Sequence, residues 1–410
     1  SNHLYDLGLS QAKRKDGMQY CDTSPFQSSD DITLILKLRE LEDAITRGDL
    51  KQLLISCARA LSEGNLLMAD CLADHLRRMV SVYGDPIQRL GAYLLEALIA
   101  RRTSSGSSIY KALKRKEKAI PDMMSYQILY EVCPYIKFGY MSANGAIAEA
   151  MKNEDRVHIV DFQIGQGSQW VSLIQAFAGR PGGPPHIRIT GVAGVDLAGR
   201  RLSDLAEICN LPFEYNHSSA ASLGEVEPSD LGLREGEALA VNFAFALHHT
   251  PDESVCTENL RDRVLRMVKR IAPKVLTLVE FDLNTNTAPF LPRFVETLEY
   301  YSAMFESIDV TLPRGHKERM NVEQHCLARE LVNIIACEGE ERVERYEPYG
   351  KWRSRLEMAG FQPFPLSSFV NSTILTLLSK YSKNYSLHER DGVLHLGWLN
   401  RNLVASCAWK

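Results

Sequence analysis

The feature that most constrains the fold is a change in the spacing of apolar residues near Arg156. From Ile32 to about Met151, apolar residues recur every three or four positions, which is typical of amphipathic helices. After Arg156, short apolar or β-branched runs alternate with helical segments; these runs lie at 157–162, 187–192, 212–215, 238–245 and 275–280. Strands that alternate with helices predict an α/β fold with a doubly wound, mostly parallel sheet that is buried on both faces.

The rest of the chain predicts a helical cap around this core. Turn residues at Gly48-Asp49, Glu63-Gly64-Asn65 and Gly84-Asp85-Pro86 punctuate the first helical region, and each suits a helix end followed by a new start. Helical spacing returns after the fifth strand, which predicts an α-helical insertion. We therefore expect a flexible tail at 1–30, a cap at 31–155, an α/β core at 156–287, an insertion that joins the cap at 288–340, and a C-terminal core at 341–410.

The C-terminal region predicts an antiparallel addition to the sheet. Asp391-Gly392 separates two strand-like runs, and this dipeptide is a strong signal for a two-residue hairpin. A parallel sheet that ends in an antiparallel hairpin is the layout of S-adenosylmethionine-dependent methyltransferases. This analogy concerns the fold alone and implies no activity.

Composition excludes several classes of protein. No apolar run approaches the roughly 20 residues that a membrane-spanning helix needs. The nine cysteines form no CxxC pair, so we expect neither a zinc site nor a dithiol. The net charge of -4 argues against sequence-independent DNA affinity. The basic clusters at 111–118 and 314–319 leave direct DNA contact open, with solvated loops as the alternative.

A glycine loop after the first strand is the clearest candidate for a ligand site. Gly165 and Gly167 follow Asp161 and precede a helix, where backbone N–H groups can approach a bound nucleotide. The fingerprint then fails, because Trp170 stands where G-x-G-x-x-G needs its third glycine, and Gln169 where G-x-G-x-G needs it. A tight structural turn is therefore the preferred interpretation. A small-ligand pocket and a methyltransferase site are the alternatives.

Polar residues near the ends of the strands complete a candidate crevice. Its members are Asp161, Gln163, Gly165, Gln166, Gly167, Asn242, His248, Glu280, Asn284 and Asn286. They include no nucleophile–base pair, so we expect no catalytic residue and no enzyme activity. His248 and His249 are adjacent, and in an extended segment their side chains would point to opposite faces. We therefore predict no metal site and no cofactor.

Two sets of apolar residues invite other roles. Leu34, Leu38, Leu41 and Ile45 form a stripe that predicts either packing within the cap or a surface for a protein partner. Near the C-terminus, the three tryptophans Trp352, Trp398 and Trp409 are predicted to be structural.

Several ordered motifs resemble those of the plant GRAS family. Val157-His158-Ile159-Val160-Asp161 is similar to the VHIID signature of that family, and leucine-rich regions flank it at about 34–100 and 202–280. A PFYRE-like motif is recognisable around Pro289-Phe290 and Arg319, and a SAW-like motif ends in Ala408-Trp409. The stretches at 138–151, 162–170 and 241–258 resemble the phytochrome A signal transduction branch of scarecrow-like proteins.

This resemblance implies that residues 31–410 form a GRAS domain with a methyltransferase-like core and a helical cap. It also implies a non-enzymatic transcriptional co-regulator, nuclear or nucleocytoplasmic, that takes part in light signalling. The implied partners are DNA-binding transcription factors, zinc-finger proteins among them, and other GRAS proteins in homo- or heterodimers. The short loop at 193–199 and Phe281-Asp282-Leu283 depart from the pattern of many relatives. Both border the candidate crevice.

Overall fold

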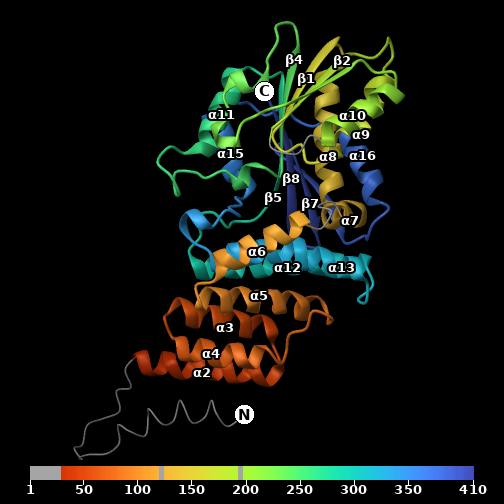
Figure 1. The fold of residues 1–410 in the computed structure, drawn as a ribbon. Coiled ribbons are helices and arrows are strands. Elements are labelled where there is room, and N and C mark those ends of the chain that lie inside the picture. The colour runs from red at the N-terminus through yellow and green to blue at the C-terminus, as the bar shows by residue number, and fades with distance from the viewer. Residues whose placement is uncertain (1–28, 120–123, 193–196) are drawn as a thin grey trace, which may run out of the picture.

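The computed structural model describes residues 29–119, 124–192 and 197–410 (Figure 1). The predicted tail at 1–30 therefore lies outside the described residues, except for its last two positions, which begin a helix. Residues 193–196 of the short loop at 193–199 also lie outside the described residues. Among the described residues, no helix is both long enough and apolar enough to cross a membrane.

Helices alone precede the first strand in the described part of the chain. They are α2 (Ser29–Arg47), α3 (Leu50–Ser62), α4 (Leu66–Leu76), α5 (Pro86–Arg102), α6 (Gly106–Ala119), α7 (Met124–Val132) and α8 (Pro134–Ala150). The three predicted helix boundaries are confirmed. Asp49, Asn65 and Asp85 each accept a hydrogen bond from a backbone N–H of the following first turn. Such caps satisfy N–H groups that have no partner within the helix.

A single eight-stranded sheet forms the core, in the order β3-β2-β1-β4-β5-β8-β7-β6. The first five strands are parallel, and β8, β7 and β6 add to them in antiparallel fashion. The strands are β1 (Arg156–Asp161), β2 (His186–Gly191), β3 (Phe213–His217), β4 (Ala238–Ala244), β5 (Val275–Phe281), β6 (Tyr385–Arg390), β7 (Val393–Trp398) and β8 (Arg401–Trp409). The predicted α/β sheet of methyltransferase-like type is thus confirmed.

The hairpin between β6 and β7 shows how local chemistry sets the register. Asp391 and Gly392 have φ angles of 53° and 78°, in the left-handed region that a type I′ turn requires. The turn pairs Arg390 with Val393 across the hairpin. Because side chains alternate along a strand, this register places Leu394, Leu396 and Trp398 on a common face.

Helices cover both faces of the sheet (Figure 1). On one face lie α8, α9 (Trp170–Ala178), α10 (Leu197–Ile208) and α16 (Ser368–Leu378); on the other lie α11 (Leu260–Arg270) and α15 (Tyr349–Met358). Neighbouring residues of β1 therefore contribute to different cores, Ile159 to one and Val160 to the other. Short helical turns occur in the connections: η1 (Leu223–Glu225), η2 (Pro228–Leu231), η3 (Leu247–His249) and η5 (Gly339–Glu341).

The insertion packs against the cap. It contains α12 (Phe290–Thr311), α13 (Lys317–Asn321), the π-helical turn η4 (Val322–Leu327) and α14 (Ala328–Ala336). Helices α12 and α14 contact α5, and α14 also contacts α6. In Figure 1, α12 and α13 lie directly above α5. Helix α8 falls within the predicted cap range but packs on β5 and β8. The division of the chain into domains stays a prediction.

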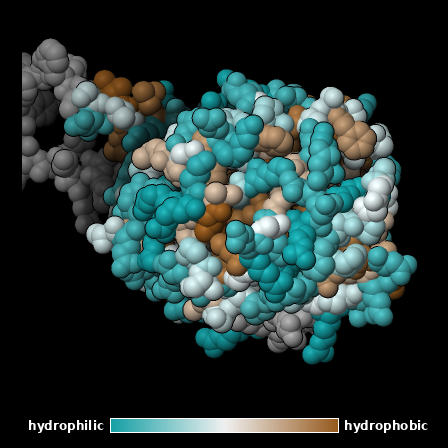
Figure 2. All heavy atoms as spheres, turned by 90° about the horizontal axis from the view of Figure 1, so that it is seen from above, coloured by the Kyte–Doolittle hydropathy of each residue, from teal (hydrophilic) through white to brown (hydrophobic). Residues whose placement is uncertain are grey.

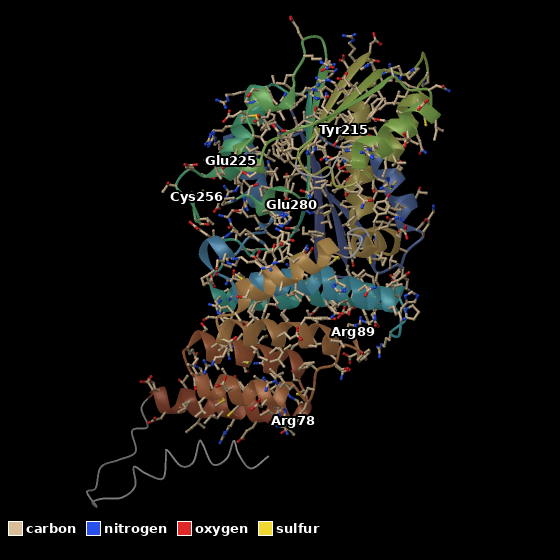
Figure 3. All side chains as sticks on the ribbon, viewed as in Figure 1. Arg78, Arg89, Tyr215, Glu225, Cys256 and Glu280 are labelled. Atoms are coloured by element: carbon tan, nitrogen blue, oxygen red, sulfur yellow. The ribbon has the colours of Figure 1, made fainter. Side chains whose placement is uncertain are left out.

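A buried network of charges fastens the cap to the insertion. Arg89 of α5 is fully buried, and Figure 3 labels it at the contact between these layers. Its Nε donates to both oxygens of Glu323 at 3.1 Å, and its Nη1 donates to Asp309 at 2.7 Å. Arg319 donates to Glu323 at 2.7 Å from the other side. The network therefore joins α5 of the cap to α12, α13 and η4 of the insertion, more than 200 residues away in the sequence.

Candidate functional site

Asp161 is the centre of a buried polar lattice at the carboxyl edge of the parallel strands. Its Oδ2 accepts a hydrogen bond from Trp170 Nε1 at 2.8 Å. Its Oδ1 accepts from Asn242 Nδ2 at 3.2 Å and from the backbone N–H of Gln163 at 3.0 Å. Gln169 exchanges hydrogen bonds with Asn242 at 3.0 and 3.2 Å. The positions that would recognise a ligand in a nucleotide-binding protein therefore bind one another here.

Burial also sets the charge of this carboxyl group. It raises the pKa of Asp161 to about 6, although hydrogen bonds from Gln163, Trp170 and Asn242 partly oppose the shift. Each of its oxygens is nevertheless held by a donor, which favours the ionised form. A ribose hydroxyl or an amino group could reach Asp161 only by displacing the Trp170 indole, which has 0% exposure.

The glycine loop has the geometry of a tight turn. Gly165 and Gly167 have φ angles of 52° and 76°, a conformation that favours glycine. Within the turn, the N–H of Gly167 donates to Ile164 at 2.8 Å, and that of Trp170 donates to Gly167 at 3.0 Å. A Cβ on Gly167 would lie 2.9 Å from the side chain of Leu202. The second glycine therefore allows α10 to pack closely on the loop, in agreement with the interpretation as a structural turn.

A second polar group surrounds His248, which follows β4 in the turn η3. His248 Nδ1 lies 2.9 Å from Glu280 Oε2, and its Nε2 lies 3.4 Å from Glu344 Oε2. Burial lowers the pKa of His248, but the charges and hydrogen bonds of Glu280 and Glu344 outweigh this effect and raise the pKa to about 10. The imidazole is therefore protonated at neutral pH. Figure 3 labels Glu280 in the interior of the molecule.

The expectation that His248 and His249 point to opposite faces is wrong. The two residues lie in a 3₁₀ turn rather than in an extended segment, and their ring centroids are 4.0 Å apart. His249 Nε2 lies 3.0 Å from Glu344 Oε2, so the same carboxylate contacts both rings. Glu344 was absent from the candidate crevice because it lies in a distant segment of the chain.

A third polar group contains Asn286. Its Nδ2 donates to Asp252 at 2.6 Å and to Glu347 at 3.0 Å. Arg355 bridges the same two carboxylates, at 2.7 Å each. These charged partners are not predicted from the sequence; the signal for them is the alternation of charges in Arg342-Val343-Glu344-Arg345-Tyr346-Glu347. Such a pattern is equally compatible with an exposed loop.

The remaining members of the predicted crevice do not converge on these groups. Asn284 donates its backbone N–H to Glu296 of α12 at 3.3 Å. Gln166 accepts a hydrogen bond from Arg201 at 2.7 Å near the surface. The candidate residues are thus distributed over separate hydrogen-bonded groups rather than around one cleft. A pocket of about 440 Å³ lies at the other end of the parallel strands, near their amino ends. It is lined by Glu154, His158, Arg234, Glu237 and Lys274, among others.

The three C-terminal tryptophans are buried in the cores on both faces. Trp352 and Trp409 belong to the core beneath α11 and α15, whereas Trp398 belongs to the core on the other face. The guanidinium of Arg261 lies 4.9 Å from the centroid of the Trp352 ring. Trp398 packs edge-on against Tyr385, with centroids 4.8 Å apart. These contacts agree with the predicted structural role.

The predicted partner stripe divides into two parts. Leu41 and Ile45 are half-buried and pack on the core of the cap, whereas Leu34 and Leu38 are 57% and 37% exposed. The exposed part widens through Ile32, Ile35 and Leu36, which are 46%, 41% and 54% exposed. Figure 2 shows hydrophobic residues gathered beside the grey atoms, where α2 begins. We refer to the residues Ile32, Leu34, Ile35, Leu36 and Leu38 as the α2 patch.

The two basic clusters differ in their surroundings. The first lies on α6 rather than in a loop, and Lys111, Lys114 and Arg115 of this cluster are exposed. In the second, Arg319 is fully buried and binds Glu323, so this residue serves the fold. The outer face of α11 adds a basic surface that was not predicted. A pocket of about 550 Å³ there is lined by Arg263, Arg266, Lys269 and Arg270, among others.

Comparison with known proteins places this architecture in a family. The GRAS domain family matches residues 50–410. The scarecrow-like transcription factor PAT1 of Arabidopsis thaliana is 66% identical over 384 residues, which cover 91% of this chain and 78% of that protein. Chitin-inducible gibberellin-responsive protein 2 of Oryza sativa subsp. japonica is 63% identical over 376 residues, which cover 89% of this chain and 69% of the relative.

The solved structures agree with this assignment. The crystal structure of SCL7 in Oryza sativa superposes with a TM-score of 0.77 at 35% identity, and the match covers 88% of this chain and 99% of the solved one. The resemblance of the VHIID-like, PFYRE-like and SAW-like motifs is thereby confirmed. The chain belongs to the GRAS domain family, in its scarecrow-like branch.

Proposed function

We propose that this GRAS domain is a non-enzymatic transcriptional regulator in plant signalling, including light signalling. It acts in the nucleus, and also in the cytoplasm, by holding DNA-binding transcription factors, zinc-finger proteins among them, or a second GRAS chain. Relatives that are named as transcription factors support the general role. The observation that carries the proposal is the α2 patch, an apolar surface on a domain whose ligand edge is occupied by its own side chains.

The occupied edge argues against a methyltransferase or a small-molecule sensor. Cofactors of doubly wound sheets bind at the carboxyl ends of the strands. Here Trp170 covers Asp161, and Leu202 packs over Gly167. Cofactor binding would require the indole to leave its buried position and the Asp161 carboxylate to exchange one donor for another. Asp161 and Trp170 therefore contribute to the fold rather than to cofactor binding.

The α2 patch has the character of a protein-binding surface. Specific interfaces combine a few apolar anchors with a polar rim. Leu34 and Leu38 are a helical turn apart, and Arg39 and Glu42 lie exposed beside them. The inner half of the same helix is anchored by Leu41 and Ile45, so the outer half is presented on a fixed support. A helix from a transcription factor or from a second GRAS chain fits such a surface.

Direct DNA binding is the second candidate, and the basic face of α11 favours it. Arg266 and Arg270 are exposed, and Arg263 is exposed but paired with Glu227 at 2.6 Å. Phosphate contacts of this kind give affinity that falls steeply with salt concentration. The net charge of -4 opposes association with DNA over the rest of the surface.

Affinity purification from plant nuclear extract, with and without nuclease, separates the two candidates. We expect transcription factors to remain bound to the domain after nuclease treatment. Replacing Leu34 and Leu38 by Asp should remove them without changing the melting temperature, because both side chains are already exposed. Leu66 and Leu67 of α4 are 43% and 60% exposed, so the Leu66→Asp/Leu67→Asp variant is a matched control that should retain the partners.

Three outcomes would contradict the proposal. Partners that leave with nuclease would identify DNA as the bridging molecule and favour the α11 surface. Full recovery with the Leu34→Asp/Leu38→Asp variant would show that the interface lies elsewhere. A clear fall in the melting temperature of that variant would assign the patch to the core of the cap.

A further inference from the structure

We propose that His248, His249 and Glu344 form a binding site for one divalent transition-metal ion of the zinc class. The ligand atoms would be Nε2 of each histidine and Oε2 of the glutamate. One potential ligand atom from each of the three residues already lies within 4.8 Å of the other two. Two imidazoles with one carboxylate are a donor set that zinc accepts, with a further position left for water or another group.

The separations match the coordination geometry. Zinc binds imidazole nitrogen and carboxylate oxygen at roughly 2.0–2.2 Å, so neighbouring ligand atoms in a tetrahedral site are about 3.3 Å apart. Glu344 Oε2 lies 3.4 Å from His248 Nε2 and 3.0 Å from His249 Nε2. In the bound state the Nε2 atoms of the two histidines would also have to lie at about this separation. The metal would replace the proton that His248 Nε2 shares with Glu344.

Residues behind the three ligands hold them in position. Glu280 accepts the Nδ1–H of His248 at 2.9 Å and its backbone N–H at 3.2 Å, which leaves Nε2 directed toward Glu344. A carboxylate behind a ligating histidine is a recurrent feature of zinc sites. Tyr346 stacks on the His248 ring at 4.2 Å, and its hydroxyl donates to Glu344 at 3.3 Å. Asn333 accepts the backbone N–H of Glu344 at 2.9 Å.

Burial and charge favour a cation at this point. Glu280 and Glu344 are both buried, at 2% and 1% exposure, and they face the same imidazole. A divalent ion that displaces the His248 proton would replace its positive charge and offset both carboxylates. The side chain of His249 is 44% exposed, so one ligand of the proposed site faces solvent. Bound metal would fasten the 342–347 segment to the end of β4.

Zinc titration of the metal-free protein tests the proposal. The protein is freed of any polyhistidine tag, its accessible cysteines are alkylated, and it is then titrated by calorimetry. We expect one equivalent to bind with a dissociation constant below about 1 μM, and zinc to raise the melting temperature. His249→Ala should weaken binding at least 30-fold and abolish the thermal shift. Its circular dichroism spectrum should be unchanged, since His249 is on the surface.

His316 provides the matched control. It is a histidine of similar exposure, 43%, with a carboxylate of Glu318 at 3.6 Å, but it has no second histidine beside it. His316→Ala should bind zinc as the unmodified chain does. Cobalt in place of zinc should give the visible absorption of a four-coordinate nitrogen and oxygen site, without a thiolate band. Binding weaker than about 10 μM, or equal affinity in His249→Ala, would overturn the proposal.

Discussion

Removal of the Arg89 side chain should destabilise the contact between cap and insertion. Arg89 is fully buried and contacts Glu323 and Asp309, which lie on η4 and α12. In Arg89→Ala, Glu323 keeps its ion pair with Arg319 but loses the one with Arg89, and the side chain of Glu323 has 0% exposure. A buried ion network that loses one partner is destabilised by about 3–5 kcal/mol, because the buried Glu323 carboxylate loses one of its cations and gains no water in exchange.

The magnitude translates into a measurable shift. Unfolding entropy is roughly 2.1 cal/mol/K per residue, or about 0.9 kcal/mol/K for the whole chain if it unfolds as a unit. A loss of about 4 kcal/mol therefore corresponds to a fall of about 4–5 °C in the melting temperature. Differential scanning calorimetry measures this fall directly, and guanidinium unfolding provides an independent value.

An exposed ion pair of the cap is the control. Arg77 and Asp74 are 2.7 Å apart, with side chains 57% and 66% exposed. Arg77→Ala should cost about 0.5 kcal/mol or less, because water screens such pairs. The double variant Arg89→Ala/Glu323→Ala should lose less than the sum of the two single variants, since the sites interact directly. A loss below about 1 kcal/mol in Arg89→Ala would refute the reasoning.

Two further predictions follow from buried side chains elsewhere in the domain. Trp398→Ala should destabilise the domain by about 3–5 kcal/mol in guanidinium unfolding, because it empties a buried space beside Tyr385; unchanged stability with lost partner binding would make Trp398 an interface residue instead. Burial and the charge of Arg188 lower the pKa of His158 to about 4. As the pH falls, the unfolded chain therefore binds a proton at His158 near pH 6.5, whereas the folded chain binds it only near pH 4. The His158 contribution should therefore lower the stability by roughly 3 kcal/mol as the pH drops from 7 to 4. His158→Gln should show a smaller fall over that range, and an identical pH profile for the two proteins would contradict the assignment.

Much of the fold could be predicted because its signals are local. The change of spacing at Arg156 separates helices from strands, and the caps at Asp49, Asn65 and Asp85 depend only on neighbouring residues. The hairpin at Asp391-Gly392 follows from the backbone conformation that these residues tolerate. In contrast, the π-helical turn at 322–327 interrupts a segment that reads as one continuous helix. Its buried Glu323 binds Arg89, a partner that no local pattern reveals.

The candidate site was harder to predict because its contacts are long-range. Because Asp161, Asn242 and Glu280 stand near the ends of their strands, the sequence predicts that they lie at the carboxyl ends of the parallel strands. It does not predict the residues that cover them. In the sequence, Trp170 is notable only because it occupies the position of the third glycine in the G-x-G-x-x-G fingerprint. In the structure, its indole donates a hydrogen bond to Asp161. His248 and His249 were assigned to an extended segment, and the 3₁₀ turn that joins their rings depends on contacts with Glu280 and Glu344.

Calorimetric titration of the domain with S-adenosylmethionine tests the central claim most directly. That claim is that Asp161, Trp170 and Asn242 occupy the ligand edge of the sheet for structural reasons, so the domain works without a methyl donor. We predict no heat of binding at micromolar protein and up to millimolar ligand. A dissociation constant below about 10 μM, equivalent to roughly 7 kcal/mol of binding free energy, would contradict the account.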